Sequence, residues 1–238
     1  MLSIIIPTYN EMKNNYLQQS IPILIACPDI EIIVIDSFST DGTIEFLNQF
    51  QIKIIQVKTQ SRAKRLNIGI QYAIAPMVLL HHPRSLLTVE GINYLNKNQM
   101  SFYWGAFTHK FDRSHFLLKF TSFYSNYIRG PRGIYYLDHC IFARKSLLED
   151  MDYIPEVDIF EDTELSLALN KQAKPVRLPF LSLTSATRFN KNGIIKQIYL
   201  NQVMKWKYYL KIDHKIMNKE YEKDISLNAN YKENNNES

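Results

Sequence analysis

Short apolar, β-branched runs alternate with longer amphipathic stretches over the first hundred residues. The short runs are nearly continuous in apolar side chains, as expected of strands buried on both faces of a sheet. They lie at Ser3–Pro7, Glu31–Asp36, Lys53–Val57 and Met77–His81. Apolar residues recur at helical spacing between them, in Tyr16–Ala26, Asp41–Phe50 and Arg62–Ala73. This alternation predicts an α/β fold with an open, mostly parallel sheet flanked by helices.

Beyond about residue 85 the pattern is less regular but still predicts a mixture of elements. Strands are expected at Phe102–Phe111, Tyr135–Ala143 and Pro175–Leu178, and helices at Phe116–Arg129 and Asp162–Gln172. The segment Arg129–Gly133 places a proline between two glycines and is expected to be a loop.

The C-terminal part is expected to hold one long amphipathic helix, Gly193–Ile212. Its apolar side consists of Ile195, Ile198, Tyr199, Val203, Trp206 and Tyr209, and its basic side of Lys196, Lys205, Lys207 and Lys211. Two explanations stay open. The apolar side closes the core of the domain, or the helix makes a peripheral contact with an anionic membrane through residues 193–212.

These patterns suggest a domain of residues 1–188, with a first half of about 1–85 and a second of about 86–188. A helical extension of residues 189–225 follows. Residues 226–238 are polar and without pattern, which predicts a disordered tail.

Composition excludes several other classes of protein. Hydrophobic residues make up 46% and charged residues 21% of the 238, which is typical of globular domains. No apolar run is long enough to cross a bilayer, and the N-terminus lacks the basic region of a signal peptide, so we expect a cytoplasmic protein. Cys27 and Cys140 have no metal-ligand spacing and are interpreted as small buried residues.

The net charge of +5 is concentrated near the C-terminus. Residues 188–219 hold 8 Lys and Arg against 1 Asp or Glu, whereas residues 1–187 are nearly balanced. A local anionic partner, such as a phosphorylated substrate or a membrane surface, is therefore favoured over nucleic acid.

Candidate chemistry is expected at the carboxyl ends of the parallel strands, where open α/β sheets bind ligands. Neither a GxGxxG nor a Walker-type glycine-rich loop follows the first strand, so dinucleotide and P-loop sites are excluded. A phosphate group would have to be held by side chains, and Arg62 and Arg84 are the candidates.

The segments SIIIPTYNE, EIIVIDSFSTDGT and SRAKRLNIGIQYA resemble the nucleotide-binding half of family 2 glycosyltransferases, which have the Rossmann-like GT-A fold. Later segments, GAF at Gly105–Phe107, YLDHCIFARK at Tyr136–Lys145 and IFEDTELSLAL at Ile159–Leu169, are similar to the acceptor half of small bacterial members. The resemblance covers roughly residues 1–188 in order. Within the family it is closest to compact single-domain transferases of the arsenosugar-biosynthesis type.

The resemblance implies an inverting transfer of a sugar from a nucleotide-sugar donor, UDP-linked, to the hydroxyl of a glycan, lipid or small molecule. It assigns Thr8 and Tyr9 to the wall of the nucleotide pocket, Glu11 to the ribose or base, Asp36 to the base, and Arg62 to the neighbourhood of the nucleotide. Asp162 matches the general base that deprotonates the acceptor.

The sequence departs from the family at the acidic motif that binds a divalent metal, manganese or magnesium. That place reads His81-His82-Pro83-Arg84-Ser85, and Arg84 stands where related small members carry the metal-binding Asp. Either Arg84 neutralises the diphosphate directly, without a metal, or the protein is a catalytically degenerate relative. Such a relative would bind a nucleotide sugar or a partner protein without turnover.

Structural roles compete with several of these assignments. Asp36 and Glu11 also suit helix caps, and Asp162 suits a first-turn charge that the helix dipole favours. His81 and His82 suggest a metal, but neighbouring strand residues point to opposite faces and no third ligand is evident, so we expect no metal site. Asp138 and His139 are placed either against the acceptor or in structural hydrogen bonds.

Overall fold

The computed structural model describes residues 1–59 and 61–221. Within them an eight-stranded sheet has the order β3-β2-β1-β4-β7-β6-β8-β5. The predicted tail of residues 226–238, and the last part of the predicted extension, lie outside the described residues.

The first half of the chain alternates strands and helices as its pattern predicts. Its elements are β1 (Leu2–Thr8), α1 (Tyr16–Ile25), β2 (Ile30–Asp36), α2 (Thr43–Leu47), β3 (Lys53–Gln56), α3 (Arg62–Tyr72), β4 (Met77–Leu80), β5 (Ser85–Leu87) and α4 (Val89–Asn98). β1 pairs in parallel with β2 and β4, and β2 pairs in parallel with β3. The carboxyl ends of these strands therefore meet at one edge of the sheet.

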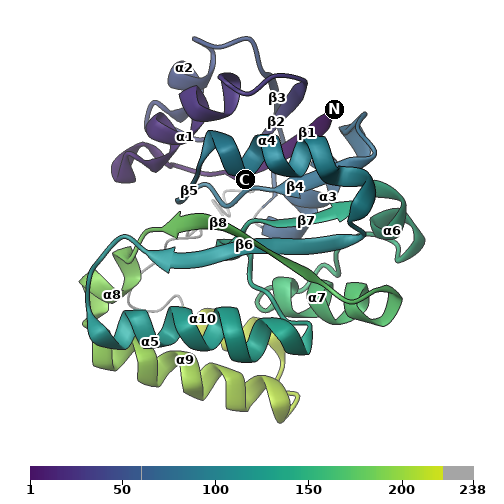
Figure 1. The fold of residues 1–238 in the computed structure, drawn as a ribbon. Helices are drawn as coiled ribbons and strands as arrows, with labels where there is room; N and C mark the ends of the chain where they lie inside the picture. The colour runs from purple at the N-terminus through teal and green to yellow at the C-terminus, as the bar shows by residue number, and fades with distance from the viewer. Residues whose placement is uncertain (60, 222–238) are drawn as a thin grey trace, which may run out of the picture.

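The second half adds strands of both directions. Its elements are β6 (Trp104–Phe111), α5 (Phe116–Tyr124), β7 (Ile141–Arg144), α6 (Lys145–Asp150), α7 (Glu161–Gln172), β8 (Val176–Thr184), α8 (Thr187–Asn192), α9 (Ile194–Tyr209) and α10 (His214–Tyr221). β7 is antiparallel to both β4 and β6, and β8 is parallel to β6 but antiparallel to β5. The result is a mixed, mostly parallel sheet with helices on both faces, a GT-A-like α/β fold (Figure 1).

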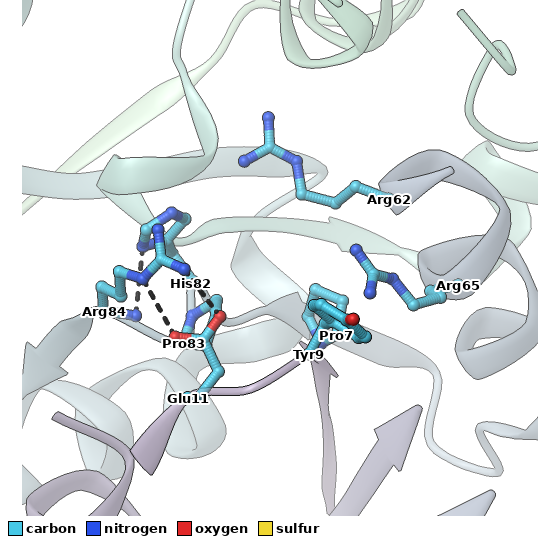
Figure 2. Close-up of a pocket in the computed structure, with 8 residues that line it drawn as sticks. All are labelled: Pro7, Tyr9, Glu11, Arg62, Arg65, His82, Pro83 and Arg84. Atoms are coloured by element: carbon cyan, nitrogen blue, oxygen red, sulfur yellow. Dashed lines mark hydrogen bonds and ion pairs between the residues drawn. The ribbon is translucent and has the colours of Figure 1, made fainter. Parts of the chain in front are cut away.

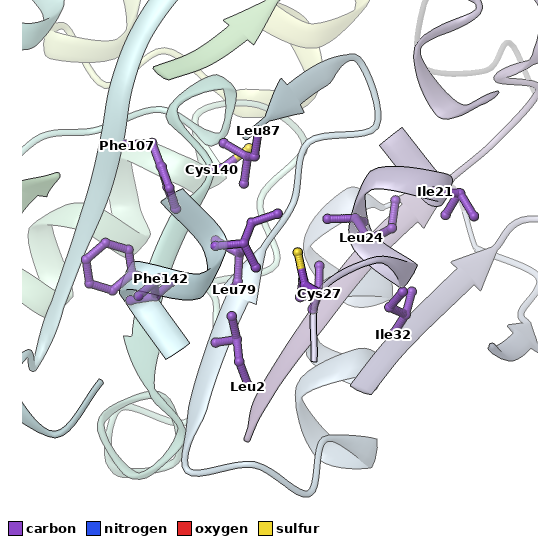
Figure 3. Close-up of a cluster of buried hydrophobic side chains, with 14 of the residues drawn as sticks. Leu2, Ile21, Leu24, Cys27, Ile32, Leu79, Leu87, Phe107, Cys140 and Phe142 are labelled. Atoms are coloured by element: carbon purple, nitrogen blue, oxygen red, sulfur yellow. The ribbon is translucent and has the colours of Figure 1, made fainter. Parts of the chain in front are cut away.

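Two apolar clusters lie on the two faces of the sheet. One joins β1 and β4 to α1, α2 and α4, and includes Leu2, Leu24 and Phe142 (Figure 3). The other joins β1 and β2 to α3, α6 and α7. Both faces of the central strands are thus covered, which explains their near-continuous apolar sequence. Cys27 and Cys140 are buried with unpaired thiols, as expected.

The close approach of α3 to the sheet requires a glycine. A Cβ atom on Gly69 would lie 2.3 Å from Cγ2 of Ile5 in β1. Because no real Cβ contact is that short, any side chain at this position would push α3 away from the sheet. The close packing of α3 on the sheet therefore fixes the position of its first turn, which carries Arg62, relative to the end of β1.

Three predicted elements differ from the structure. The segment predicted as one strand, Tyr135–Ala143, begins instead with a 3-10 turn at Leu137–His139, and only Ile141–Arg144 pairs in the sheet. The expected loop after Arg129 contains a 3-10 turn, Gly130–Arg132. The helix predicted over Phe116–Arg129 ends as an α-helix at Tyr124 and continues as a π-helical turn over Ser125–Arg129.

The C-terminal helix buries a different face from the one that the pattern emphasises. Its predicted apolar side chains Ile195, Tyr199, Trp206 and Tyr209 are exposed, whereas Gln197 and Met204 are buried. Tyr208 and His214 instead attach α9 and α10 to the start of α7, through a hydrogen bond to Glu164 (2.7 Å) and one to the Ile159 carbonyl (2.8 Å). The explanation that the predicted face closes the core is therefore wrong for these four side chains. No helix in the described part of the chain is long and apolar enough to span a membrane.

Candidate functional site

A small hollow of about 20 Å³ lies where β1, β4 and the first turn of α3 meet. It is lined by Pro7, Tyr9, Glu11, Arg62, Arg65, His82, Pro83 and Arg84. Figure 2 shows the side chains of Arg62 and Arg65 extending from α3 over the hollow at which Arg84 meets Glu11. Three guanidinium groups at one site are suited to binding an anion with several oxygens, such as a diphosphate.

Local hydrogen bonds fix the two arginines of α3. The hydroxyl of Ser61 caps the helix by accepting from the Lys64 N–H at 3.1 Å. Arg62 and Arg65 follow one turn apart and so lie on the same side of the helix. Arg65 is buried and donates from Nη1 to the Thr8 carbonyl at 3.1 Å and to the Ser37 hydroxyl at 3.0 Å. Its charge is thus held beside the ends of β1 and β2.

Arg84 forms a two-pronged ion pair with Glu11. Its Nε and Nη2 atoms donate to the two carboxylate oxygens of Glu11 at 2.9 and 3.0 Å (Figure 2). Glu11 also accepts from the side-chain amide of Asn14 at 2.8 Å. The carboxylate predicted to approach a ribose or base therefore faces Arg84 in this structure, and the two side chains are largely buried together.

Asp36 and Thr8 form a layer beneath this hollow. Asp36 is 0% exposed, and its carboxylate accepts from the Thr8 hydroxyl at 2.8 Å and from the Ser39 backbone N–H at 2.8 Å. Neither Asp36 nor Thr8 is among the residues that line the hollow. Asp36 thus holds the loop after β2 against the end of β1, and its contact with a base stays a prediction.

A second cavity, of about 940 Å³, adjoins the first and shares Arg62, His82 and Arg84 with it. Residues of α5, α9 and the start of α7 enclose it, and most of them are apolar or aromatic. Two carboxylates, Asp138 and Asp162, lie in its wall. The cavity is large enough for an organic molecule and places these acids within one enclosure with the arginines.

Asp162 has the properties of a base that is active near neutral pH. Burial and the adjacent Glu161 carboxylate raise its pKa to about 7, against opposing effects of Arg62 and of the Leu137 N–H. That N–H donates to Oδ2 of Asp162 at 3.2 Å. Glu161 itself is buried and forms an ion pair with Arg62. A carboxylate whose pKa lies near the working pH is well suited to general-base catalysis.

Asp138 belongs to a buried polar cluster on another side of the same cavity. Its carboxylate oxygens lie 3.5 Å from Nε2 of His109 and 3.9 Å from Nε2 of His139. Burial opposes its ionisation, but the two histidines and Arg129 hold its pKa at about 2. Burial lowers the pKa values of both histidines, that of His139 to about 3. Asp138 is therefore ionised near neutral pH and can accept hydrogen bonds from a ligand.

The residues present do not fit a divalent metal. Arg84, paired with Glu11, stands at the position where the family's acidic ligand is expected. Burial lowers the pKa of His81 to about 4, and its ring nitrogens lack hydrogen-bond partners within the part of the chain that is described. Across residues 1–59 and 61–221, no three His, Cys, Asp or Glu side chains are grouped so as to hold a metal ion.

The structure brings together most of the residues singled out from the sequence. Tyr9, Glu11, Arg62 and Arg84 line the small hollow, and Asp162 lies in the adjoining cavity. Sequence reasoning missed Arg65, although its spacing of three residues from Arg62 is a signal for a shared helix face. It also missed Arg129 and His109, whose approach to Asp138 depends on the course of the intervening loops and on packing, which no sequence motif records.

The strand order and the flanking helices define a class of fold, the GT-A-like α/β proteins. Residues 3–82, about a third of the chain, match the family model described as Glycosyl transferase family 2. This part of the chain, which includes the strands and the helix start around the small hollow, is therefore similar to family 2 glycosyltransferases. No curated protein sequence matches the chain.

Two solved structures illustrate the shared fold. A structure of Staphylococcus aureus TarS, residues 1–349 in complex with UDP-GlcNAc, is 20% identical with a TM-score of 0.64, over 77% of this chain and 58% of that one. The mannosyltransferase PcManGT from Pyrobaculum calidifontis, in complex with GDP-Man and Mn²⁺, is 16% identical with a TM-score of 0.56, over 76% of this chain and 56% of that one. The chain thus spans less than two thirds of the length of these structures.

Proposed function

We propose that the protein transfers a sugar from a nucleotide-sugar donor, UDP-linked, to a hydroxyl acceptor with inversion at the anomeric carbon. One observation carries this proposal: Asp162, with its pKa near 7, shares a cavity with Arg62 and Arg84, which also line the small hollow at the strand ends. The family match of residues 3–82 and the complex of TarS with UDP-GlcNAc support the choice of donor. The finer resemblance to arsenosugar-type transferases stays a prediction.

In the proposed reaction the acceptor occupies the large cavity and the diphosphate lies against the guanidinium groups of Arg62, Arg65 and Arg84. The acceptor oxygen attacks the anomeric carbon from the side opposite the diphosphate, and its proton passes to the carboxylate of Asp162. The bond between the anomeric carbon and the phosphate oxygen breaks, and the nucleoside diphosphate leaves with the electron pair. The arginines meet the negative charge that develops on the leaving group.

No step in this scheme passes through a metal, because the donor set at the strand ends does not fit one. Fixed guanidinium groups stabilise a departing diphosphate by the same electrostatic effect. Burial, together with the charges of Arg62 and Arg84, lowers the pKa of His82 well below its usual value, so this ring is neutral beside the arginines. The positive charge of the site is thus supplied by arginine alone.

The test is a panel of UDP- and GDP-sugars incubated with the protein and a mixture of hydroxyl acceptors, with release of nucleoside diphosphate and formation of glycosylated product both measured. Product formation with inversion is the expected result. Release without product would indicate hydrolysis, and it would contradict the acceptor role of the cavity.

A second candidate function is binding of a nucleotide sugar without turnover. The two-pronged ion pair between Arg84 and Glu11 favours this candidate. Glu11 already neutralises the guanidinium group that would otherwise bind the diphosphate. Calorimetry showing donor binding, together with the absence of product across the panel, would support this candidate over the first.

Asp36→Ala is expected to weaken UDP binding about tenfold, because the loop after β2 would lose the charged hydrogen bonds that hold it. Isothermal titration calorimetry with UDP measures the effect, and a thermal melt without ligand measures the cost to folding. Asp36→Asn is the matched control, since it keeps the shape of the side chain and removes its charge. UDP affinity unchanged in both variants would exclude Asp36 from the nucleotide site.

A further inference from the structure

Two helical segments carry exposed aromatic stripes beside the large cavity. On α5 and the turn that follows it, Phe116, Phe120, Phe123 and Tyr127 are exposed. On α9 the exposed set is Ile195, Tyr199, Trp206 and Tyr209, together with Leu210 just after the helix. Spacings of three and four residues place each set along one side of its helix.

The two stripes belong to one region of the molecule. Leu118 of α5 shares a small apolar cluster with Ile194 and Ile198 of α9. Figure 1 shows these helices side by side, away from the helices that cover the nucleotide-binding half. Phe120 and Trp206, one from each stripe, also line the large cavity, so the exposed aromatic rings stand at its mouth.

The same segments carry positive charge and no negative charge. Residues 116–129 and 187–212 contain eight Lys and Arg and no Asp or Glu. On α9, at about 100° per residue, Lys196 and Lys207 fall on one side of the exposed stripe and Lys205 on the other. An aromatic stripe between lysines matches the interface of an anionic bilayer, where Trp and Tyr lie at the headgroups and Lys binds their phosphates.

We propose that the face formed by α5 and α9 docks on an anionic membrane and brings the mouth of the large cavity to the lipid headgroups. The docking is independent of catalysis. Docking also implies that the acceptor is an amphiphile taken from the membrane surface, and this implication rests on the proposed function. The membrane is favoured over a second copy of the chain because this face keeps an excess of positive charge, reduced by the pairing of Lys207 with Glu220 of α10, and this excess would oppose pairing of the face with itself.

The first experiment measures co-sedimentation of the full chain with vesicles of phosphatidylcholine mixed with phosphatidylglycerol, and with vesicles of phosphatidylcholine alone. Binding to the anionic vesicles that weakens as salt rises is the expected result. Tryptophan emission gives a second readout, because Trp206 is 69% exposed and Trp104 is 0% exposed. A blue shift on binding, abolished in Trp206→Phe, would place α9 in the interface.

Matched variants test whether vesicle binding depends on this face in particular or on exposed apolar side chains in general. Phe116→Ser with Ile195→Ser removes two side chains that are 72% and 77% exposed. The control pair, Ile74→Ser with Met100→Ser, removes side chains that are 70% and 75% exposed on other connections of the fold. We expect vesicle binding to fall about tenfold or more in the first pair, and to stay unchanged in the control pair.

Charge is tested in the same way. Lys119→Glu with Lys211→Glu changes two exposed cations, one on α5 and one just after α9, and Lys58→Glu with Lys97→Glu changes two exposed cations elsewhere. Both pairs alter the net charge equally, and only the first is expected to weaken binding, by roughly tenfold or more. Equal effects of the two pairs, no salt-sensitive binding by the wild type, or a stable dimer that buries Trp206 would overturn the proposal. None of these measurements uses a donor sugar, so their outcome is separate from that of the transferase assay.

Discussion

Asp162→Asn is expected to reduce turnover by about two orders of magnitude or more while leaving donor affinity nearly unchanged. The amide keeps the shape of the side chain and its hydrogen bond from the Leu137 N–H, but it has no basicity with which to accept the acceptor's proton. Steady-state kinetics with the active donor measure turnover, and calorimetry with UDP measures binding. Near-normal turnover in the variant would transfer the role of base to Asp138 or Glu161.

The same residue predicts a pH dependence. Because the pKa of Asp162 is raised to about 7, its basic form is lost as pH falls through 7, and kcat should drop about tenfold per pH unit below that point. Folding stability runs in the opposite direction. The folded state holds this proton more tightly than the unfolded chain, so the contribution of Asp162 to stability is lost as pH rises through 7. In Asp162→Asn both pH effects should disappear, and its melting temperature at pH 8 should be no lower than that of the wild type.

Arg84→Ala is expected to weaken donor binding about ten- to hundredfold, the value of one or two charge-assisted hydrogen bonds to a diphosphate. Donor binding and any transfer in the wild type should survive EDTA and gain nothing from manganese. UDP-sugar affinity measured with EDTA, with manganese, and in the variant tests both statements. Strict dependence on manganese would contradict them and would point to metal ligands outside the groups described above.

The variant also leaves Glu11 buried without its partner, and an unpaired buried carboxylate alone destabilises a protein by about 3–5 kcal/mol. The double variant Glu11→Ala with Arg84→Ala removes both charges and separates the two effects. If Arg84 binds the diphosphate, the double variant still binds donor as weakly as Arg84→Ala does. If the loss came from Glu11, binding returns. Arg84→Asp should bind worst, because it adds a further negative charge beside Glu11 and the diphosphate.

The fold of the first half of the chain follows closely from its sequence because local pattern and tertiary structure agree there. Strands such as β1 are buried on both faces, so their apolar runs are unambiguous, and Ser61 marks the start of α3 by its own hydrogen bond. The prediction of a strand just before β7 is wrong because Cys140 adopts a left-handed backbone (φ 52°), which breaks the extended run. A left-handed residue of this kind leaves no signal in a hydrophobic pattern.

The candidate site likewise has a part that the sequence predicts and a part that it does not. Tyr9, Arg62 and Asp162 occur in motifs at element ends, and the structure places them around the two adjoining cavities. The partners of these residues depend on side-chain direction across distant segments, as in the pair that Arg84 makes with Glu11, 73 residues away. The exposure of one side of α9 could not be predicted from the sequence for a related reason. Apolar side chains occur on more than one side of α9, so the hydrophobic periodicity of the sequence cannot say which side is buried. Packing against the rest of the fold decides this.

The ion pair between Arg62 and Glu161 joins the start of α3 to the start of α7, and so connects the two halves of the molecule. Arg62 lowers the pKa of Asp162, and Glu161 raises it. An anion bound to Arg62 would offset its charge, and the proton affinity of Asp162 would rise. Thermodynamic reciprocity then requires that protonating Asp162 tightens anion binding by the same factor. Anion binding at Arg62 and the basicity of Asp162 are therefore coupled electrostatically, through the three neighbouring side chains Arg62, Glu161 and Asp162.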